Sequence, residues 1–227
     1  MVFVLSLTLT RFALTLGMII GLLGVPAHAV VDSPPVVNRA QALQGLDDPS
    51  PKKRLAAMGR LGGVGTMADA DRLISHLYDP DDGVRQLSGA ALRQILSRSG
   101  NNEIDARYQQ GVEQMNASKL REALATFSSI IAKRPAFAEA WNKRATLYYL
   151  LGELDLSLKD CDEVIKRNPN HFGALSRYAQ IYLQKGELEL AKTYFERAYK
   201  VNPNMEGIPD AIEQLQQTLE EKRRRSI

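Results

Sequence analysis

Three prolines, Pro135, Pro169 and Pro203, recur at a fixed step of 34 residues. Small and apolar residues keep this step in further columns: Gly111, Ala145 and Ala179; Ala123, Ser157 and Ala191; Phe127, Cys161 and Phe195. Such a period is typical of repeat proteins, whose units cannot bury their apolar faces alone and therefore stack. It predicts an all-α chain of similar helical hairpins packed one on another.

Glycine and proline divide each repeat into two helices. In the second copy, the spacing predicts one helix near 139–150 and another near 155–167. Gly152 follows the first helix, because glycine accepts the left-handed backbone of a helix end. Pro169 follows the second, because proline cannot continue a helix. Gly186 takes the place of Gly152 in the third copy, and Ser118 takes it in the first.

The residues at these places resemble the tetratricopeptide repeat (TPR) family, whose pattern is W-x2-L-G-x2-Y, then A-x3-F, then P. The copies span 104–137, 138–171 and 172–205. The last two supply Trp141, Ala145, Tyr148, Ser157, Cys161 and Pro169, and then Leu175, Tyr178, Ala179, Tyr182, Ala191, Phe195 and Pro203. The phrase WNKRATLYYL is also similar to exported bacterial members of the family. The resemblance implies a right-handed α-solenoid whose first helices line a concave groove.

The flanking segments predict further helices. Residues 206–227 place Ile208, Ile212, Leu215 and Leu219 at helical spacing, which predicts a capping helix followed by a basic tail. Residues 38–100 contain two copies, 31 residues apart, of an Asp-Pro start followed by a helix. Their layout resembles HEAT repeats, so this segment is expected to add two helical repeats before the TPR copies.

The first 29 residues have the composition of a secretory signal peptide. Arg11 precedes an apolar run over 12–25, and Ala27-His28-Ala29 forms a small-x-small cleavage site. The run is shorter than the roughly 20 residues that a membrane span needs. Cleavage after Ala29 is therefore favoured over an uncleaved anchor, and residues 30–37 are expected to be an extended linker. The predicted location is the periplasm.

No set of residues indicates catalysis, a cofactor or a metal. His76 and His171 have no second ligand at metal-binding spacing, and Cys161 occupies a position where the family has a packing residue. The chain is predicted not to be an enzyme. Its formal charge of +3, with acids and bases intermixed, indicates no nucleic-acid partner.

The first helices of the repeats are where the resemblance implies a binding surface. We predict a protein-binding or peptide-binding site at Tyr108, Asn142, Tyr149 and Arg177. Aromatic residues near arginine are the usual anchors of interfaces. A structural alternative is that Arg177 only pairs with Glu139 across the repeats.

Chaperone-binding family members hold a terminal carboxylate with a Lys, Asn, Asn, Lys, Arg set in this groove. The matching positions here are Tyr108, Val112, Lys143, Gly173 and Arg177. Only Arg177 agrees, so this resemblance implies no chaperone partner.

The sequence favours a noncatalytic interaction module, an adaptor in the bacterial cell envelope that binds a protein or peptide segment. One alternative is a regulatory or ligand-carrying subunit of an envelope enzyme. Another is a membrane-anchored scaffold, which requires the N-terminal segment to be retained. The oligomeric state is not predicted.

Overall fold

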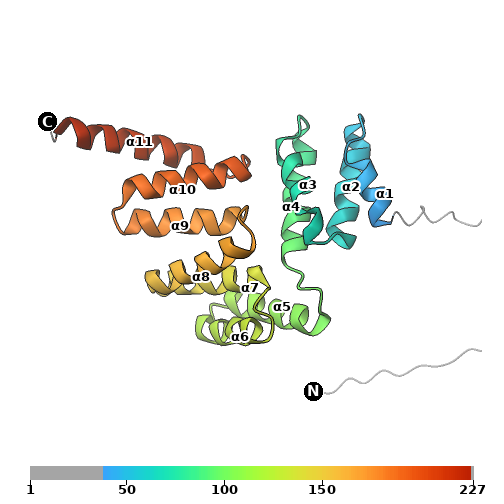
Figure 1. Cartoon of the computed structure of the whole chain (residues 1–227), viewed down its shortest axis with the longest axis horizontal. Coiled ribbons are helices and arrows are strands. Elements are labelled where there is room, and N and C mark those ends of the chain that lie inside the picture. The colour runs from blue at the N-terminus through green and yellow to red at the C-terminus, as the bar shows by residue number, and fades with distance from the viewer. Residues whose placement is uncertain (1–37, 226–227) are drawn as a thin grey trace, which may run out of the picture. The chain divides into compact units, whose positions relative to one another are not determined.

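The computed structural model describes residues 38–225. The predicted signal peptide (1–29) and linker (30–37) lie outside the described residues, as do residues 226–227. Over the described range the chain is helical and has no strand, which confirms the predicted all-α solenoid (Figure 1). Its α-helices are α1 (Arg39–Gly45), α2 (Pro51–Val64), α3 (Ala70–Ser75), α4 (Asp82–Leu96), α5 (Asn102–Asn116), α6 (Leu120–Lys133), α7 (Ala138–Leu150), α8 (Leu154–Arg167), α9 (Phe172–Gln184), α10 (Leu188–Val201) and α11 (Ile208–Arg225).

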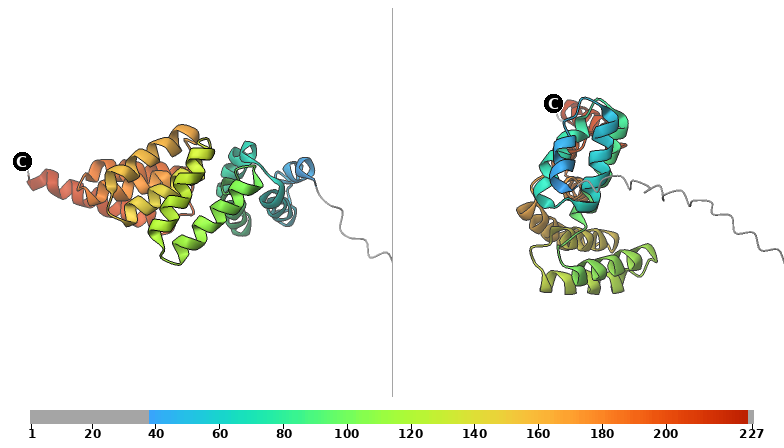
Figure 2. Two further views of the ribbon diagram at one scale, coloured as in Figure 1. Left: turned by 90° about the horizontal axis from the view of Figure 1, so that it is seen from below. Right: turned by 90° about the vertical axis from the view of Figure 1, so that its right-hand side faces the viewer.

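Three hairpins, α5–α6, α7–α8 and α9–α10, follow one another in the order of the sequence (Figures 1 and 2). The turn inside each hairpin needs one residue with a left-handed backbone. Gly152 and Gly186 provide it with φ of +80° and +75°, and Ser118 adopts it in the first hairpin with φ of 58°. A side chain disfavours this region, so the first turn is the strained one.

The small residues of the 34-residue period lie where the two helices of a hairpin come closest. A Cβ atom built on Gly111 would lie 2.7 Å from Cζ of Phe127, which is fully buried. Ala145 and Cys161 are also fully buried and share one core cluster in the second hairpin. Burial raises the pKa of the Cys161 thiol to about 12, so Cys161 is a neutral packing group there.

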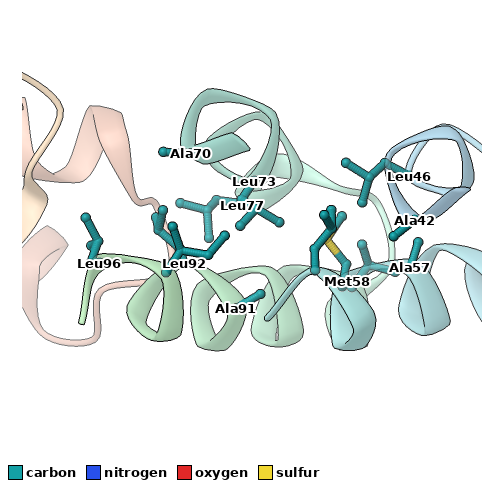
Figure 3. Packing of buried hydrophobic residues seen from close by; sticks show 13 residues of the cluster. Ala42, Leu46, Ala57, Met58, Ala70, Leu73, Leu77, Ala91, Leu92 and Leu96 are labelled. Carbon is teal, nitrogen blue, oxygen red and sulfur yellow. The ribbon is translucent and has the colours of Figure 1, made fainter. Parts of the chain in front are cut away.

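The N-terminal helical segment, residues 38–100, has its own core of 13 buried residues, shown in Figure 3. Arg54 joins its two copies, because the guanidinium donates to both carboxylate oxygens of Asp79 at 2.8 and 2.7 Å. Arg54 also donates to the carbonyls of Asp48 and Pro49. These contacts hold the two 31-residue copies against each other. The resemblance of the segment to HEAT repeats stays a prediction.

The same segment contacts the far end of the third hairpin. Asn204 donates to the carbonyl of Leu77 at 2.8 Å and accepts from Nε of Arg85 at 3.2 Å. Tyr78 donates to the carbonyl of Lys200, and Phe172 packs against the core of the segment. Residues far apart in sequence therefore meet beside the start of α9 and the end of α10.

Helix α11 covers the last hairpin. Two of its three buried residues, Ile208 and Leu215, join the core cluster that contains Phe195 of α10. The opposite end of α11 carries four consecutive bases, Lys222 to Arg225, all exposed. Among residues 38–225, no helix combines the length and apolar character needed to cross a membrane.

Candidate functional site

The first helices of the hairpins present one face each to a common groove. On α7, Asn142, Thr146 and Tyr149 are spaced by four and three residues and therefore share a face. On α9, Arg177 and Gln180 do the same. Two hydrogen bonds join the helices, from Arg177 to Oγ1 of Thr146 at 3.5 Å and from Gln184 to the hydroxyl of Tyr149 at 3.2 Å. The four predicted site residues lie on three helices: Tyr108 on α5, Asn142 and Tyr149 on α7, and Arg177 on α9.

A buried carboxylate, Glu139, lies at the base of the groove. Its Oε2 is 2.8 Å from Nε2 of His171. Its Oε1 accepts from the hydroxyl of Tyr108 at 3.4 Å and from Nδ2 of Asn142 at 3.1 Å, and Nζ of Lys143 lies 3.4 Å away. These five residues, here called the Glu139 cluster, come from α5, from α7 and from the residue just before α9.

Hydrogen bonds settle the protonation states in the Glu139 cluster. Nδ1 of His171 accepts from the backbone N–H of Ala174 and so caps α9, which leaves the ring proton on Nε2, facing Glu139. Burial by itself would raise the pKa of Glu139, but the bond from His171, the charge of Lys143 and the bond from Asn142 together lower it. Glu139 is therefore ionised at neutral pH.

Tyr108 is buried, whereas the predicted role as an interface anchor would place it at the surface. Its side chain is 6% exposed, and its ring meets Phe127 and Phe137 edge to face, with centroids 5.7 and 5.5 Å apart. Burial and the charge of Glu139 raise the pKa of its hydroxyl, which therefore stays a donor. Tyr108 supports the floor of the groove.

The second pair of predicted residues forms a separate unit. The guanidinium of Arg177 stacks over the ring of Tyr149, 4.4 Å from its centroid, and donates to Oε1 of Gln180 at 2.7 Å. Its Nε is buried and has no hydrogen-bond partner among the described residues. Burial lowers the pKa of Arg177.

Arg177 is not paired with Glu139, so the structural alternative considered from the sequence is wrong. Within residues 38–225 no carboxylate lies at ion-pair distance from Arg177, whereas Glu139 is engaged by His171 and Lys143. The groove therefore contains a half-buried cation whose charge the described part of the chain does not neutralise.

Sequence reasoning left three members of the Glu139 cluster out of the predicted site: Glu139, Lys143 and His171. A usable signal was present for Glu139, which precedes Asn142 and Lys143 by three and four residues and so shares their helix face. No local pattern connects His171 to that face, because the two residues are 32 positions apart.

The site can bind but has no arrangement for nucleophilic catalysis. Both ring nitrogens of His171 are used, one by the cap of α9 and one by Glu139. No Ser, Thr or Cys lies within hydrogen-bond distance of the imidazole in the described structure. In the same range, no three His, Cys, Asp or Glu side chains gather in a way that could hold a metal ion.

Two hollows lie beside the first helices of the hairpins. A cavity of about 380 Å³ opens beside the Glu139 cluster and is closed on one side by Arg93 and Leu96 of α4. A second hollow of about 280 Å³ lies between Leu183 of α9 and Leu215 of α11. The first hollow therefore contains the polar side chains of the Glu139 cluster, and the second is lined mainly by apolar side chains.

Comparison with known proteins identifies the repeats. Residues 138–171 and 172–205 each match a family model described as tetratricopeptide repeat. The chain therefore contains TPR repeats over 138–205. No curated protein matches the sequence.

Solved structures with similar folds contain TPR domains. The Sgt2 TPR domain from Aspergillus fumigatus is 19% identical with a TM-score of 0.50, over 55% of this chain and 83% of that chain. The first TPR of Spaghetti (RPAP3), bound to the HSP90 peptide SRMEEVD, is 22% identical with a TM-score of 0.49, over 51% and 92%. A tetratricopeptide repeat protein from Parabacteroides merdae is 24% identical with a TM-score of 0.45, over 69% and 64%. The likeness to the Sgt2 domain supports the fold alone.

Proposed function

We propose that the concave groove binds an acidic segment of a partner protein and carries out no catalysis on it. The observation that carries this proposal is Arg177. Its guanidinium is half-buried, stacked on Tyr149 and without a carboxylate partner in the described structure. A cation in such a position costs stability unless something neutralises it. A carboxylate of the partner would supply the missing charge.

The neighbours of Arg177 suit an extended segment. Tyr149 offers ring surface and a hydroxyl, a combination that favours interface anchors. The side-chain nitrogen of Asn142 donates to Glu139. Its side-chain oxygen therefore remains to accept from a backbone N–H of the partner. Lys143 is partly exposed and has further donors besides the one facing Glu139. The carboxylate of the partner would thus be held by Arg177, and the adjoining backbone by Asn142 and Lys143.

The proposed location is the bacterial cell envelope, where the protein would act as an adaptor. This rests on the apolar run over 12–25 and the Ala27-His28-Ala29 site. The expected mature N-terminus is Val30, in the periplasmic fraction. Mass spectrometry that finds intact Met1 on soluble cytoplasmic protein would contradict export, and intact Met1 in the membrane fraction would favour an anchored scaffold.

The binding experiment compares wild type with the double variant Tyr149→Ala, Arg177→Ala. A partner captured from envelope extract is identified, and its acidic segment is then titrated by calorimetry as a synthetic peptide. We expect the double variant to bind about thirty-fold more weakly, the loss typical of an interface hot spot. Circular dichroism must show that the variant remains folded.

Arg197 provides the matched control. Its guanidinium also lies over a tyrosine, Tyr194, at 4.9 Å, but it is exposed on α10. Arg197→Ala should therefore leave the affinity unchanged. A folded Tyr149→Ala, Arg177→Ala variant that binds as tightly as wild type would show that the groove is not the site.

A further inference from the structure

Exposed leucines gather at the turns of the second and third hairpins. Large hydrophobic side chains that are more than a third exposed number seven in the described chain, and five are leucines at these two turns. They are Leu150, Leu151 and Leu156 beside the α7–α8 turn, and Leu183 and Leu190 beside the α9–α10 turn, with exposures from 39% to 56%. We call them the leucine edge. Scattered exposed leucines are ordinary, but a contiguous group indicates an interaction surface.

Two contacts show that the turns lie side by side. Nζ of Lys185 in one turn is 2.7 Å from Oδ1 of Asp155 beside the other, and Gln184 donates to the hydroxyl of Tyr149. Leu156 and Leu190 are 34 residues apart and take equivalent places in their repeats. Leu183 also borders the hollow of about 280 Å³ beside α11. The two turns that carry the exposed leucines are therefore neighbours in space.

The leucine edge has an acidic fringe. Glu153 and Asp155 accompany the first turn, and Glu187 and Glu189 accompany the second. Residues 150–156 contain no base, and the single base of residues 183–190, Lys185, pairs with Asp155. A partner for this surface needs apolar side chains together with positive charge.

The chain itself has such a segment at the same side of the repeats. Helix α11 runs past the α9–α10 turn, and its C-terminal end lies on the side of that turn (Figures 1 and 2). That end carries Lys222, Arg223, Arg224 and Arg225, all exposed. Arg225 pairs with Glu221 one helical turn earlier, at 3.6 Å, rather than with the acids of the turns.

We propose that the leucine edge is the interface of a two-fold symmetric dimer of this chain. The edge presents, in order, the acidic α7–α8 turn, the α9–α10 turn and the basic end of α11. A two-fold axis at the α9–α10 turn sets two such rows against each other in opposite directions. The basic end of each copy then faces the acidic turn of the other, and the leucines of the central turns meet. One patch is thus complementary to itself, as a symmetric dimer requires.

Charge reversal at each half of the interface tests this arrangement. The basic-end variant is Arg224→Glu, Arg225→Glu, and the acidic-turn variant is Glu153→Lys. Glu153 makes no side-chain hydrogen bond to its helix start, and Arg224 and Arg225 are exposed, so both variants should fold. Analytical ultracentrifugation of the full chain should show a dimer for wild type, weakened about tenfold or more in each variant because like charges then face each other.

Mixing the two variants separates this proposal from a general effect of charge. In the mixed pair, the substituted α11 end of one copy faces the substituted α7–α8 turn of the other, and the two unsubstituted regions face each other as in wild type. Both contacts then join opposite charges, so a heterodimer should form although each variant alone dissociates. Leu156→Ser, Leu190→Ser should weaken the dimer of every combination. A wild-type chain that stays monomeric from low micromolar concentration upward would overturn the proposal. So would an association that all of these substitutions leave unchanged.

Discussion

Nε2 of His171 lies 2.8 Å from Oε2 of Glu139, and this contact joins the residue that caps α9 to the first helix of the second repeat. Both side chains are buried. His171 also caps α9 through its other ring nitrogen. The pair thereby couples the position of α9 to the floor of the groove, so the ionisation of Glu139 affects both stability and the groove.

Acid should weaken the fold through Glu139. Its pKa in the folded chain lies below the ordinary value of 4.5, since the bonds and charges around it outweigh its burial. The unfolded chain therefore takes up the proton first as the pH falls below 4.5, and the stabilisation from the ionised carboxylate is progressively lost. Urea unfolding at a series of pH values should show a falling free energy of unfolding in this acid range.

Glu139→Gln isolates this contribution. Glutamine keeps the shape but not the charge, so we expect a loss of about 1–3 kcal/mol at neutral pH, where a charged acceptor is replaced by a neutral one. The difference between wild type and variant should shrink as the pH falls, because wild type then becomes neutral as well. A difference that is constant from neutral pH into the acid range would show that Glu139 does not titrate as described.

Arg177 should destabilise the folded state of the free protein. Arg177→Met removes a half-buried cation without a carboxylate partner, so the free energy of unfolding should stay unchanged or rise by up to about 1 kcal/mol, although the stacking on Tyr149 is lost. Partner binding should fall at the same time. Thermal unfolding and calorimetric titration of one sample measure both effects.

Arg144→Met is the matched comparison for Arg177→Met. Arg144 also stacks on an aromatic ring, that of Trp141 at 5.0 Å, but it donates to both oxygens of the buried Asp160 at 2.7 and 2.8 Å. Its removal leaves that charge unpaired and should cost about 3–5 kcal/mol. If Arg177→Met costs as much as Arg144→Met, Arg177 is a structural residue.

The first hairpin should gain stability from glycine at its turn. Ser118 has φ of 58°, whereas the equivalent Gly152 and Gly186 have φ of +80° and +75° without a side-chain penalty. Ser118→Gly should raise the free energy of unfolding by about 1 kcal/mol. The reverse change, Gly152→Ser, should lower it by a similar amount, since a Cβ there meets nothing within 4 Å and only the backbone is strained. Equal melting temperatures for wild type and both variants would contradict this account.

Gly111 should not accept the alanine that the other two repeats have at its place. The added Cβ would lie 2.7 Å from Cζ of Phe127, whose ring is fully buried and cannot move away freely. Gly111→Ala should therefore cost about 1–3 kcal/mol in chemical denaturation. Phe127→Leu removes the ring, so the double variant should lose less than the sum of the single losses. If the two losses are additive, the cost of Gly111→Ala does not come from contact with the ring of Phe127.

The repeat hairpins could be predicted from the sequence because their signals are local. The helices predicted near 139–150 and 155–167 are observed at Ala138–Leu150 and Leu154–Arg167. Glycine at the turn and proline after the second helix act through their own backbone angles, which hardly depend on the rest of the fold. The close approach observed at Gly111 also has a sequence signal, since a small residue at a fixed period is typical of a helix contact.

The binding site was predicted less completely. Tyr149 and Arg177, both named as site residues from the sequence, stack on each other. The prediction that placed Tyr108 at an interface did not foresee its burial against Phe127 and Phe137. The link between Asn142 and His171 through Glu139 had no counterpart in any local pattern.

The sequence by itself determined the helices, their turns and the columns of small residues, because each depends on neighbours within about one helical turn. Only the tertiary structure decided that Glu139 engages His171 and leaves Arg177 without a carboxylate in the described chain. It also decided that two leucine-rich turns lie together, joined by Lys185 and Asp155. These contacts join residues 30 or more positions apart, and they depend on how far each hairpin is rotated on the one before it. That rotation results from the packing of whole cores, to which no single stretch of sequence corresponds.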